Sequence, residues 1–250
     1  MKGETKSLKC ILWRPKKHKI TDSSVIAVDS GCISCWDLNT WKEAYKFSAG
    51  ELGIFTTGVW NPHNAELVMY ANGSTISASD LRQPTPAFSI PSAHGERSLI
   101  RDMDCTPDNP NFFASCGDDS KIKFWDQRKP SSPVKVFSTH SHWVWKVQFH
   151  PYFDSLAISS SSDKSVCLWD VRSISRETTK RSHGRPAKLV KSYQSHDESV
   201  YSVCWSGCDM DELSGGNVFD WNIFASVAYD GRVIFNRVPH DKTTAVIAGR

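Results

Sequence analysis

Serine, histidine and aspartate, the side chains of a nucleophilic triad, recur together three times in this chain. In each set the histidine comes first, and the aspartate follows the serine by four residues. Such a trio can activate a serine for acyl transfer. An active site is normally single, however, and the chain has no G-x-S-x-G nucleophile elbow. We therefore interpret the sets as a repeated scaffold and expect no enzyme activity. The sets are His94, Ser115 and Asp119; His140, Ser159 and Asp163; and His196, Ser226 and Asp230.

Two further patterns could bind a metal ion. Cys32 and Cys35 form a C-x-x-C pair, but a zinc knuckle needs a second pair of ligands, and none follows at a suitable spacing. His140 and His142 are separated by one residue, but His140 already belongs to a repeated set. We expect the two cysteines to be buried thiols on a strand, and we expect no metal and no cofactor.

The composition of the 250-residue chain restricts the class of protein. Hydrophobic residues make up 39%, charged residues make up 23%, and the formal net charge is +3. These values indicate a folded protein without the basic surface of a nucleic-acid binder. No apolar run approaches the roughly 18 residues of a membrane span, and no secretory signal is visible. The eight cysteines are therefore expected to be reduced thiols in the cytosol.

The elements that would position these side chains repeat along the chain. Five segments share a polar turn followed by alternating apolar residues, which is the pattern of a β-strand. Trp-Asp ends three of them, Ser-Asp ends the second, and Asn-Arg ends the last. A four-stranded propeller blade takes about 40–45 residues, and successive segments are offset by 43, 46, 44 and then 67 residues. The segments are 27–39, 70–82, 115–128, 159–172 and 226–238.

The alternation of apolar residues, the frequent turn formers and the lack of a helical period predict an all-β fold. The His, Ser, Asp and Trp at matched offsets resemble the WD-repeat family, whose members fold as β-propellers. Trp125 and Trp169 look like the fourth members of the family's structural tetrads, in which indole, hydroxyl, imidazole and carboxylate form a buried polar chain. Asn236 stands at that place in the last repeat, and the first two repeats lack complete tetrads.

Five repeats are fewer than the seven blades of the usual family propeller, which needs roughly 300 residues. We expect a single propeller region over 1–250, which is an incomplete seven-bladed ring without about two N-terminal blades. Such a region would be an open arc that is poorly soluble alone. The expected repeats are approximately 8–48, 54–91, 94–138, 140–192 and 196–250, with insertions at 173–191 and 206–221.

A basic segment between 172 and 191 carries seven cationic residues against one glutamate. One interpretation is a solvated insertion, and the other is a docking site for an acidic partner or an anionic membrane. The basic residues are Arg172, Arg176, Lys180, Arg181, Arg185, Lys188 and Lys191.

Aromatic residues and an arginine near the starts of predicted strands are candidates for protein contact, because such residues often anchor interfaces. Strand alternation makes Trp145 an equally good core residue. The candidates are Arg101, Trp143, Tyr201 and Tyr229.

Two Trp-Asp pairs continue into W-D-x-R, with Arg128 and Arg172 in the last position. The motif Ser79-Asp80-Leu81-Arg82 follows this pattern loosely. This resembles the substrate receptors of cullin–RING ubiquitin ligases, in which the arginine meets the ligase adaptor. Arginine also often follows Trp-Asp in ordinary repeats, so both interpretations stay open.

Three segments are similar to one WD-repeat family in particular, the EARP and GARP complex-interacting proteins. They are ASCGDD (114–119), HSHWVW (140–145) and YDGRVIFNRVP (229–239). The resemblance implies a non-enzymatic adaptor that binds vesicle-tethering complexes of the EARP/GARP type in endosomal recycling and endosome-to-Golgi trafficking. It also implies a cytoplasmic protein at the periphery of the trans-Golgi network and endosomes, with no nucleic-acid partner. A cullin–RING substrate receptor is the alternative.

Overall fold

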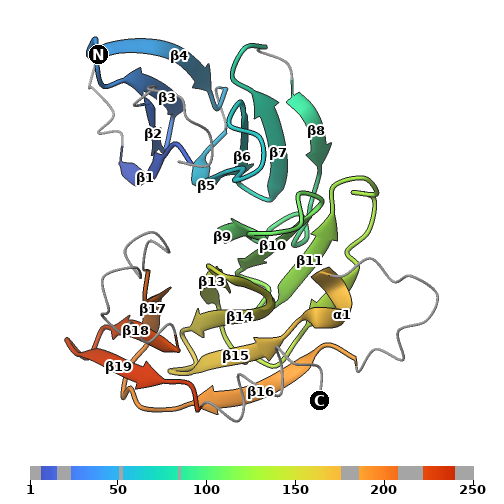
Figure 1. Cartoon of the computed structure of the whole chain (residues 1–250), viewed down its shortest axis with the longest axis vertical. Coiled ribbons are helices and arrows are strands. Elements are labelled where there is room, and N and C mark those ends of the chain that lie inside the picture. Colours follow the sequence, from blue (N-terminus) through green and yellow to red (C-terminus); the bar gives the residue numbers. More distant parts are fainter. Residues whose placement is uncertain are drawn as a thin grey trace, which may run out of the picture.

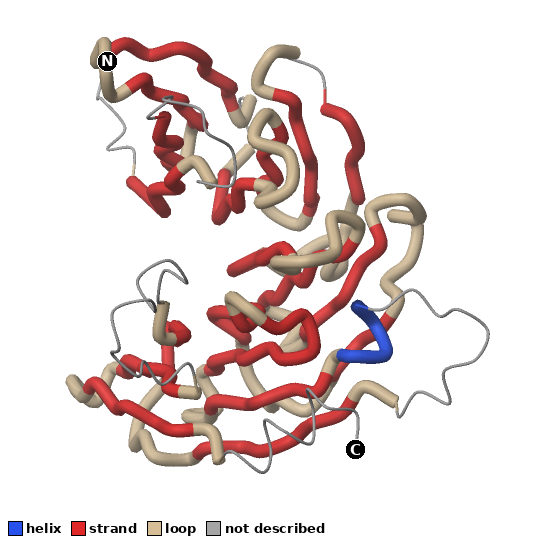
Figure 2. Tube along the Cα trace, viewed as in Figure 1, coloured by secondary structure: helices blue, strands red, loops and turns tan. Residues whose placement is uncertain are grey.

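Strands dominate the fold. The computed structural model describes residues 7–15, 24–50, 53–83, 86–175, 186–207 and 222–239. Within these ranges the chain forms nineteen strands and one four-residue helix, α1 (Arg172–Ser175), as Figure 2 shows. The all-β expectation is confirmed.

The strands form five antiparallel sheets, which we call blades 1 to 5 in chain order. Each blade is a meander, because its strands lie side by side in the order in which the chain makes them. Blades 1 to 4 have four strands, and the described part of blade 5 has three. The strands are β1 (Leu8–Trp13), β2 (Ser24–Asp29), β3 (Cys32–Asp37) and β4 (Lys42–Ser48) in blade 1; β5 (Phe55–Trp60), β6 (Leu67–Asn72), β7 (Thr75–Asp80) and β8 (Pro86–Ile90) in blade 2; β9 (Ile100–Cys105), β10 (Phe112–Gly117), β11 (Ile122–Asp126) and β12 (Lys135–Phe137) in blade 3; β13 (Val144–His150), β14 (Phe153–Ser161), β15 (Val166–Asp170) and β16 (Lys188–Tyr193) in blade 4; and β17 (Val200–Trp205), β18 (Ile223–Ala228) and β19 (Val233–Arg237) in blade 5.

The first strand of each blade packs against the first strand of the next, so that β1, β5, β9, β13 and β17 follow one another along the inside of the molecule. Figure 1 shows the five blades as an open arc, with blade 1 at one end and blade 5 at the other. This is the open arc that the repeat count predicts.

Apolar side chains fill the seam between each pair of neighbouring blades. Trp125 packs in the seam between blades 2 and 3, and Trp169 packs in the seam between blades 3 and 4. Ile26 and Phe55 lie in the seam between blades 1 and 2, and Phe224 lies in the last seam. Because each blade packs on its neighbours alone, the stability of the arc is approximately a sum of nearest-neighbour interfaces.

The two ends of the arc expose apolar side chains. Trp36 is the counterpart of Trp125 in blade 1, but it is 36% exposed where Trp125 is 2% exposed. The difference follows from the seams, because Trp125 and Trp169 each pack toward the preceding blade, and none precedes blade 1 in the described structure. Other exposed apolar residues at the two ends are Ile11, Trp13, Val233 and Phe235.

Two carboxylates on β9 bind the inner edge of β13. Asp102 accepts a hydrogen bond from the Val147 N–H at 3.2 Å, and Asp104 accepts one from the Phe149 N–H at 2.7 Å. An edge strand otherwise leaves such N–H groups unpaired. Lys146 pairs with Asp102 at 3.2 Å, and burial raises the pKa of Asp104 to about 7. These contacts fix blade 4 against blade 3, next to the surface described below.

Candidate functional site

In blade 3 the structure brings the predicted set together as a chain of hydrogen bonds. His94 lies with Nδ1 2.7 Å from Asp119 and with Nε2 2.8 Å from the Ser115 hydroxyl. The Trp125 indole N–H donates to the same hydroxyl at 2.8 Å. Because a carboxylate only accepts, Nδ1 carries the proton, and neutral His94 then accepts from the serine through Nε2. Each group in the chain therefore donates to the next, from indole to carboxylate.

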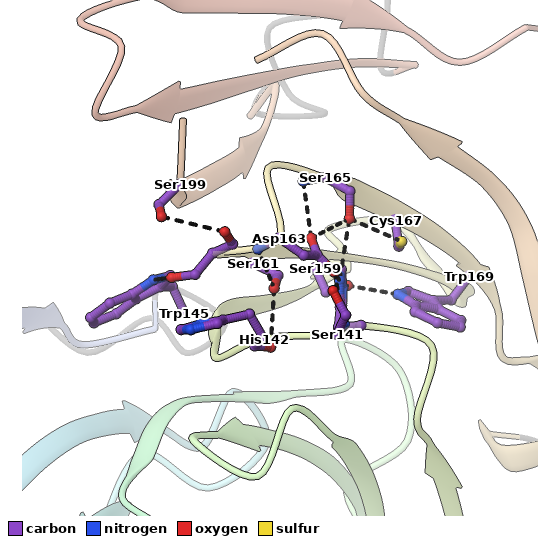
Figure 3. Close-up of polar contacts among 12 residues, drawn as sticks. Ser141, His142, Trp145, Ser159, Ser161, Asp163, Ser165, Cys167, Trp169 and Ser199 are labelled. Carbon is purple, nitrogen blue, oxygen red and sulfur yellow. Dashed lines mark hydrogen bonds and ion pairs between the residues drawn. The ribbon is translucent and has the colours of Figure 1, made fainter. Parts of the chain in front are cut away.

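Blade 4 repeats this arrangement, which Figure 3 shows in close-up. His140 lies 2.8 Å from both Asp163 and Ser159, and the Trp169 indole donates to Ser159 at 2.9 Å. Ser165 adds a further donor to the Asp163 carboxylate, at 2.6 Å.

In blade 5 the polar chain has three members. His196 lies 2.9 Å from Asp230 and 2.9 Å from Ser226. Asn236 stands where the other blades have Trp, and the Ser226 hydroxyl instead donates to the Ile234 carbonyl at 3.5 Å.

The burial of these serines decides what the sets can do chemically. Ser115 and Ser159 are 0% exposed and Ser226 is 1% exposed, so a substrate cannot reach any of the three hydroxyls. Burial would raise the pKa of Asp163, but the hydrogen bonds from His140 and Ser165 outweigh it and hold that pKa well below its usual range. Each aspartate thus stays ionised and ties a turn to the loop before the inner strand.

Blade 2 builds an equivalent link from different residues, which the sequence did not reveal. Tyr70 stands in the register position of the tetrad serine and Ser79 in that of the tetrad Trp, and their hydroxyls lie 3.1 Å apart. Asn72 accepts from the Ile54 N–H at 2.9 Å and donates to the Ala49 carbonyl at 3.2 Å. In blade 2 the large side chain is on the second strand and the small one on the third, the reverse of the tetrads. The Asn72 amide makes the link to neighbouring loops that aspartate and histidine make in the tetrads.

Backbone hydrogen bonds place four turns in equivalent positions at the same end of the blades. In each, an N–H in the turn after the second strand donates to the carbonyl just before the first strand. The pairs, from blade 2 to blade 5, are Gly73 with Ile54, Asp118 with Leu99, Ser162 with Trp143, and Tyr229 with Ser199. The tetrads therefore hold the loops at this end of the arc, and the side chains of these loops form its surface.

Two of the four predicted contact residues of this end, Arg101 and Trp143, meet Trp145 through ring contacts. The Arg101 guanidinium lies 5.2 Å from the Trp143 ring and 4.6 Å from the Trp145 ring, and Asp118 holds it through two hydrogen bonds of 2.6 and 2.9 Å. The Trp145 indole N–H donates to Ser162 at 2.6 Å, and Ser199 donates to the Ser162 carbonyl at 3.4 Å. Two seams are thus closed by side chains at this end.

The aromatic surface continues onto blade 5. Tyr201 and Tyr229 pack with ring centroids 5.0 Å apart, and they are 41% and 69% exposed. Trp143 is 41% exposed, and Trp145 is half-buried. We call this surface the rim surface; it consists of Arg101, Trp143, Trp145, Tyr201 and Tyr229.

Comparison with known proteins agrees with this architecture. The model of the EIPR1 β-propeller family matches residues 2–169. The chain belongs to the EIPR1 β-propeller family. It is 35% identical to EARP and GARP complex-interacting protein 1 of Macaca fascicularis, over 93% of this chain and 63% of that protein. It is 32% identical to EARP-interacting protein 1 of Caenorhabditis elegans, over 95% and 64%, and 31% identical to the WD repeat-containing protein DWA2 of Arabidopsis thaliana, over 92% and 63%.

This EIPR1-family chain therefore spans a little under two thirds of the length of these relatives. The expected resemblance to the EARP and GARP complex-interacting proteins is confirmed, as is the β-propeller fold. The names of two of these relatives describe proteins that interact with EARP or with the EARP and GARP complexes.

The arginines of the W-D-x-R motifs bind within their own turns in this EIPR1-family chain. Arg128 and Arg172 each pair with the aspartate two residues earlier, at 2.8 and 2.7 Å, and Arg82 pairs with Asp80 at 2.6 Å. Arg172 is also nearly covered, with a side chain 13% exposed. The arrangement gives each arginine a local structural partner.

The predicted basic insertion needs a correction. Lys188 and Lys191 lie on β16, where backbone pairing with β15 makes them part of the blade, and Arg172 begins α1 with its charge paired to Asp170. The other basic residues, between 176 and 185, lie outside the described residues, as do 208–221 of the second insertion. The three described cations thus lie on two separate elements, α1 and β16, and nothing in the described structure supports an acidic or membrane partner for them.

The two cysteines of the C-x-x-C pair are structural residues of blade 1. Cys32 and Cys35 are buried on β3, and the Cys32 thiol donates to Asp29 at 3.0 Å. Across the described ranges, no group of three or more His, Cys, Asp or Glu side chains is placed to hold a metal ion. The same ranges contain no helix long and apolar enough to cross a membrane.

Proposed function

We propose that this chain is a non-enzymatic propeller adaptor that binds multisubunit vesicle-tethering complexes of the EARP and GARP type. Its cellular role would be endosomal recycling and endosome-to-Golgi trafficking, from the cytoplasmic side of the trans-Golgi network and endosomes. The observation that carries the proposal is the family match together with relatives whose names state interaction with these complexes.

The rim surface supports this role physically. Interface anchors are typically Trp, Tyr and Arg in fixed conformations, because such side chains bury much area at little entropic cost. Trp143 and Tyr229 are exposed, and their loops are tied down by the polar chains of His140 and Asp230. The tetrads would thus act in binding by holding the rim residues in place before the partner arrives.

Affinity purification followed by mass spectrometry tests the proposal. Recovery of tether subunits with the wild-type chain, and their loss with Trp143→Ala and Tyr229→Ala, is the expected result. Recovery of a cullin adaptor that disappears with Arg128→Ala and Arg172→Ala, without tether subunits, would contradict it and support the ubiquitin-ligase alternative.

A further inference from the structure

A hollow of about 370 Å³ opens at the seam between blades 2 and 3, next to the rim surface. Its apolar lining comes from Ile54 and Leu99, which are 54% and 36% exposed. Gly73 forms part of the wall, and a Cβ added there would meet no atom within 4 Å. The remaining lining is polar: Asn72, Ser74, Glu96, Arg97 and Ser98.

Two residues that line the hollow, Gly73 and Leu99, stand at positions where the next seam carries larger side chains. At the seam between blades 3 and 4, the inner strand supplies Arg101, the turn supplies Asp118, and the loop of the next blade supplies Trp143. These three side chains stack and pair, and they close that seam. The corresponding residues at the seam between blades 2 and 3 are Thr56, Gly73 and Leu99.

Each of these residues is smaller than its counterpart, and the hollow lies beside the two of them that replace Asp118 and Trp143, namely Gly73 and Leu99. By the symmetry of the fold, the hollow lies at a position where the next seam holds the Trp143 indole. A flat apolar side chain is therefore the group that we expect it to accept. A volume of this size lies at the lower end of ligand pockets, about 300–1,000 Å³, and suits one large side chain rather than a whole domain.

The charged residues at the hollow favour a peptide over an isolated apolar molecule. Glu96 and Arg97 are both exposed, and neither forms an ion pair with any described residue. A carboxylate accepts from backbone N–H groups and a guanidinium donates to carbonyl groups. An extended peptide offers both on either side of an anchoring side chain, so the pair is complementary to it.

We propose that this hollow binds the aromatic side chain of an extended peptide segment from a partner protein. The segment would continue over Leu99 onto the Arg101–Trp143 stack of the rim surface. The inference deepens the proposed function and rests on it, because the partner would be a subunit of the bound complex.

Titration of the 250-residue chain with N-acetyl-tryptophanamide, followed by backbone amide NMR, tests the hollow without any tether complex. We expect saturable shifts at Ile54, Gly73 and Leu99. Leu99→Trp places an indole where blade 4 has Trp143, so it should fill the hollow. We expect it to weaken binding of the probe at least tenfold, although the substitution makes the surface more apolar. N-acetyl-lysinamide should bind at least tenfold more weakly to the wild-type chain.

The matched control is Val136→Trp, because Val136 is similarly exposed, at 37%, but lies on β12 away from the hollow. It should leave the probe's affinity unchanged. Shifts that do not saturate, that spread over the exposed ends of the arc, or that persist in Leu99→Trp would overturn the proposal. Thermal unfolding of each variant checks folding.

Different experimental outcomes would contradict the proposed function and the proposed peptide site. Probe binding in the hollow without recovery of tether subunits would contradict the proposed function alone. Recovery of tether subunits that is unchanged in Leu99→Trp would contradict the hollow as the anchor site alone.

Discussion

Single carboxylates join the turns to the loops in this molecule. Asp163 accepts from His140, from the Ser141 backbone N–H at 3.1 Å and from Ser165. One side chain therefore ties its own turn to the loop at His140 and Ser141, which lie 23 and 22 residues earlier in the sequence. A buried group in such a network contributes mainly through the cost of leaving its partners unsatisfied.

Asp163→Ala should lower the free energy of unfolding by about 1–3 kcal/mol, because His140 and Ser165 lose their acceptor in a buried site. Denaturant unfolding at pH 7 measures this. Asp197→Ala is the control, since that carboxylate is 86% exposed and its ion pair with Arg232 lies at the surface. Equal stability of the Asp163 variant and the wild type would show that the polar chain does not stabilise the blade.

The effect of Asp163 depends on pH with a definite sign. Its pKa is lower in the folded chain than in the unfolded one, so its stabilisation is present above about pH 4 and is lost as the pH falls further. The difference between wild type and Asp163→Ala should therefore shrink between pH 4 and pH 2.

The contribution of Asp104 to stability changes with pH in the opposite direction. Its folded pKa of about 7 lies above that of an unfolded aspartate, so its ionisation costs stability as the pH rises from about 4 to 7. Asp104→Asn keeps an acceptor for the Phe149 N–H and removes the charge. The variant should gain about 1–3 kcal/mol relative to wild type between pH 4.5 and pH 7.5. A constant difference across that range would contradict the role of burial.

At the scale of elements, the strands and three polar sets were predictable because their residue types recur at nearly constant spacing. The polar link of blade 2 was not predictable, because Tyr70 and Ser79 exchange the large and small partners, and Asn72 replaces the aspartate one residue away from its expected place. A pattern of residue types detects a repeated contact only when the same types make it.

The rim surface and its neighbouring hollow show a second limit of sequence patterns. The Arg101, Asp118 and Trp143 cluster draws its members from three segments on two blades. Arg101 and Trp143 could be picked out as exposed candidates, but their contact and the role of Asp118 depend on how the blades pack. Spacing along the chain carries no signal for such contacts.

Asn72→Ala tests the substitute link of blade 2. Removing the amide leaves the Ile54 N–H and the Ala49 carbonyl without their partner, and we expect a loss of about 1–2 kcal/mol in the free energy of unfolding. Asn111→Ala is the matched control, because its side chain makes no hydrogen bond to the rest of the described chain. Losses of the same size in both variants would contradict the assigned role of Asn72.

At the scale of the whole molecule, the arc carries apolar residues at both of its ends. A blade buries both faces when it has two neighbours, whereas blades 1 and 5 have one each in the described structure. Phe235 is 74% exposed and Trp13 is 69% exposed as a result. Contiguous apolar surfaces of this kind promote association in water.

The 250-residue chain should therefore self-associate as its concentration rises, and Trp13→Glu combined with Phe235→Glu should reduce the association. Size-exclusion chromatography with light scattering measures the mass directly. Val134→Glu is a control at a residue that is 50% exposed in blade 3, away from the ends. A wild-type chain that stays monomeric at all concentrations would contradict the exposure of the two ends.

Quantitative binding of a purified EARP-type tethering complex to this chain tests most directly whether the rim surface is the partner site. We expect Trp143→Ala and Tyr229→Ala each to weaken binding at least tenfold, or about 1.4 kcal/mol, with unchanged thermal unfolding. Arg128→Ala, whose guanidinium is paired within its own turn after β11, should bind like the wild type. Wild-type affinity in both rim variants would contradict the rim surface as the binding site.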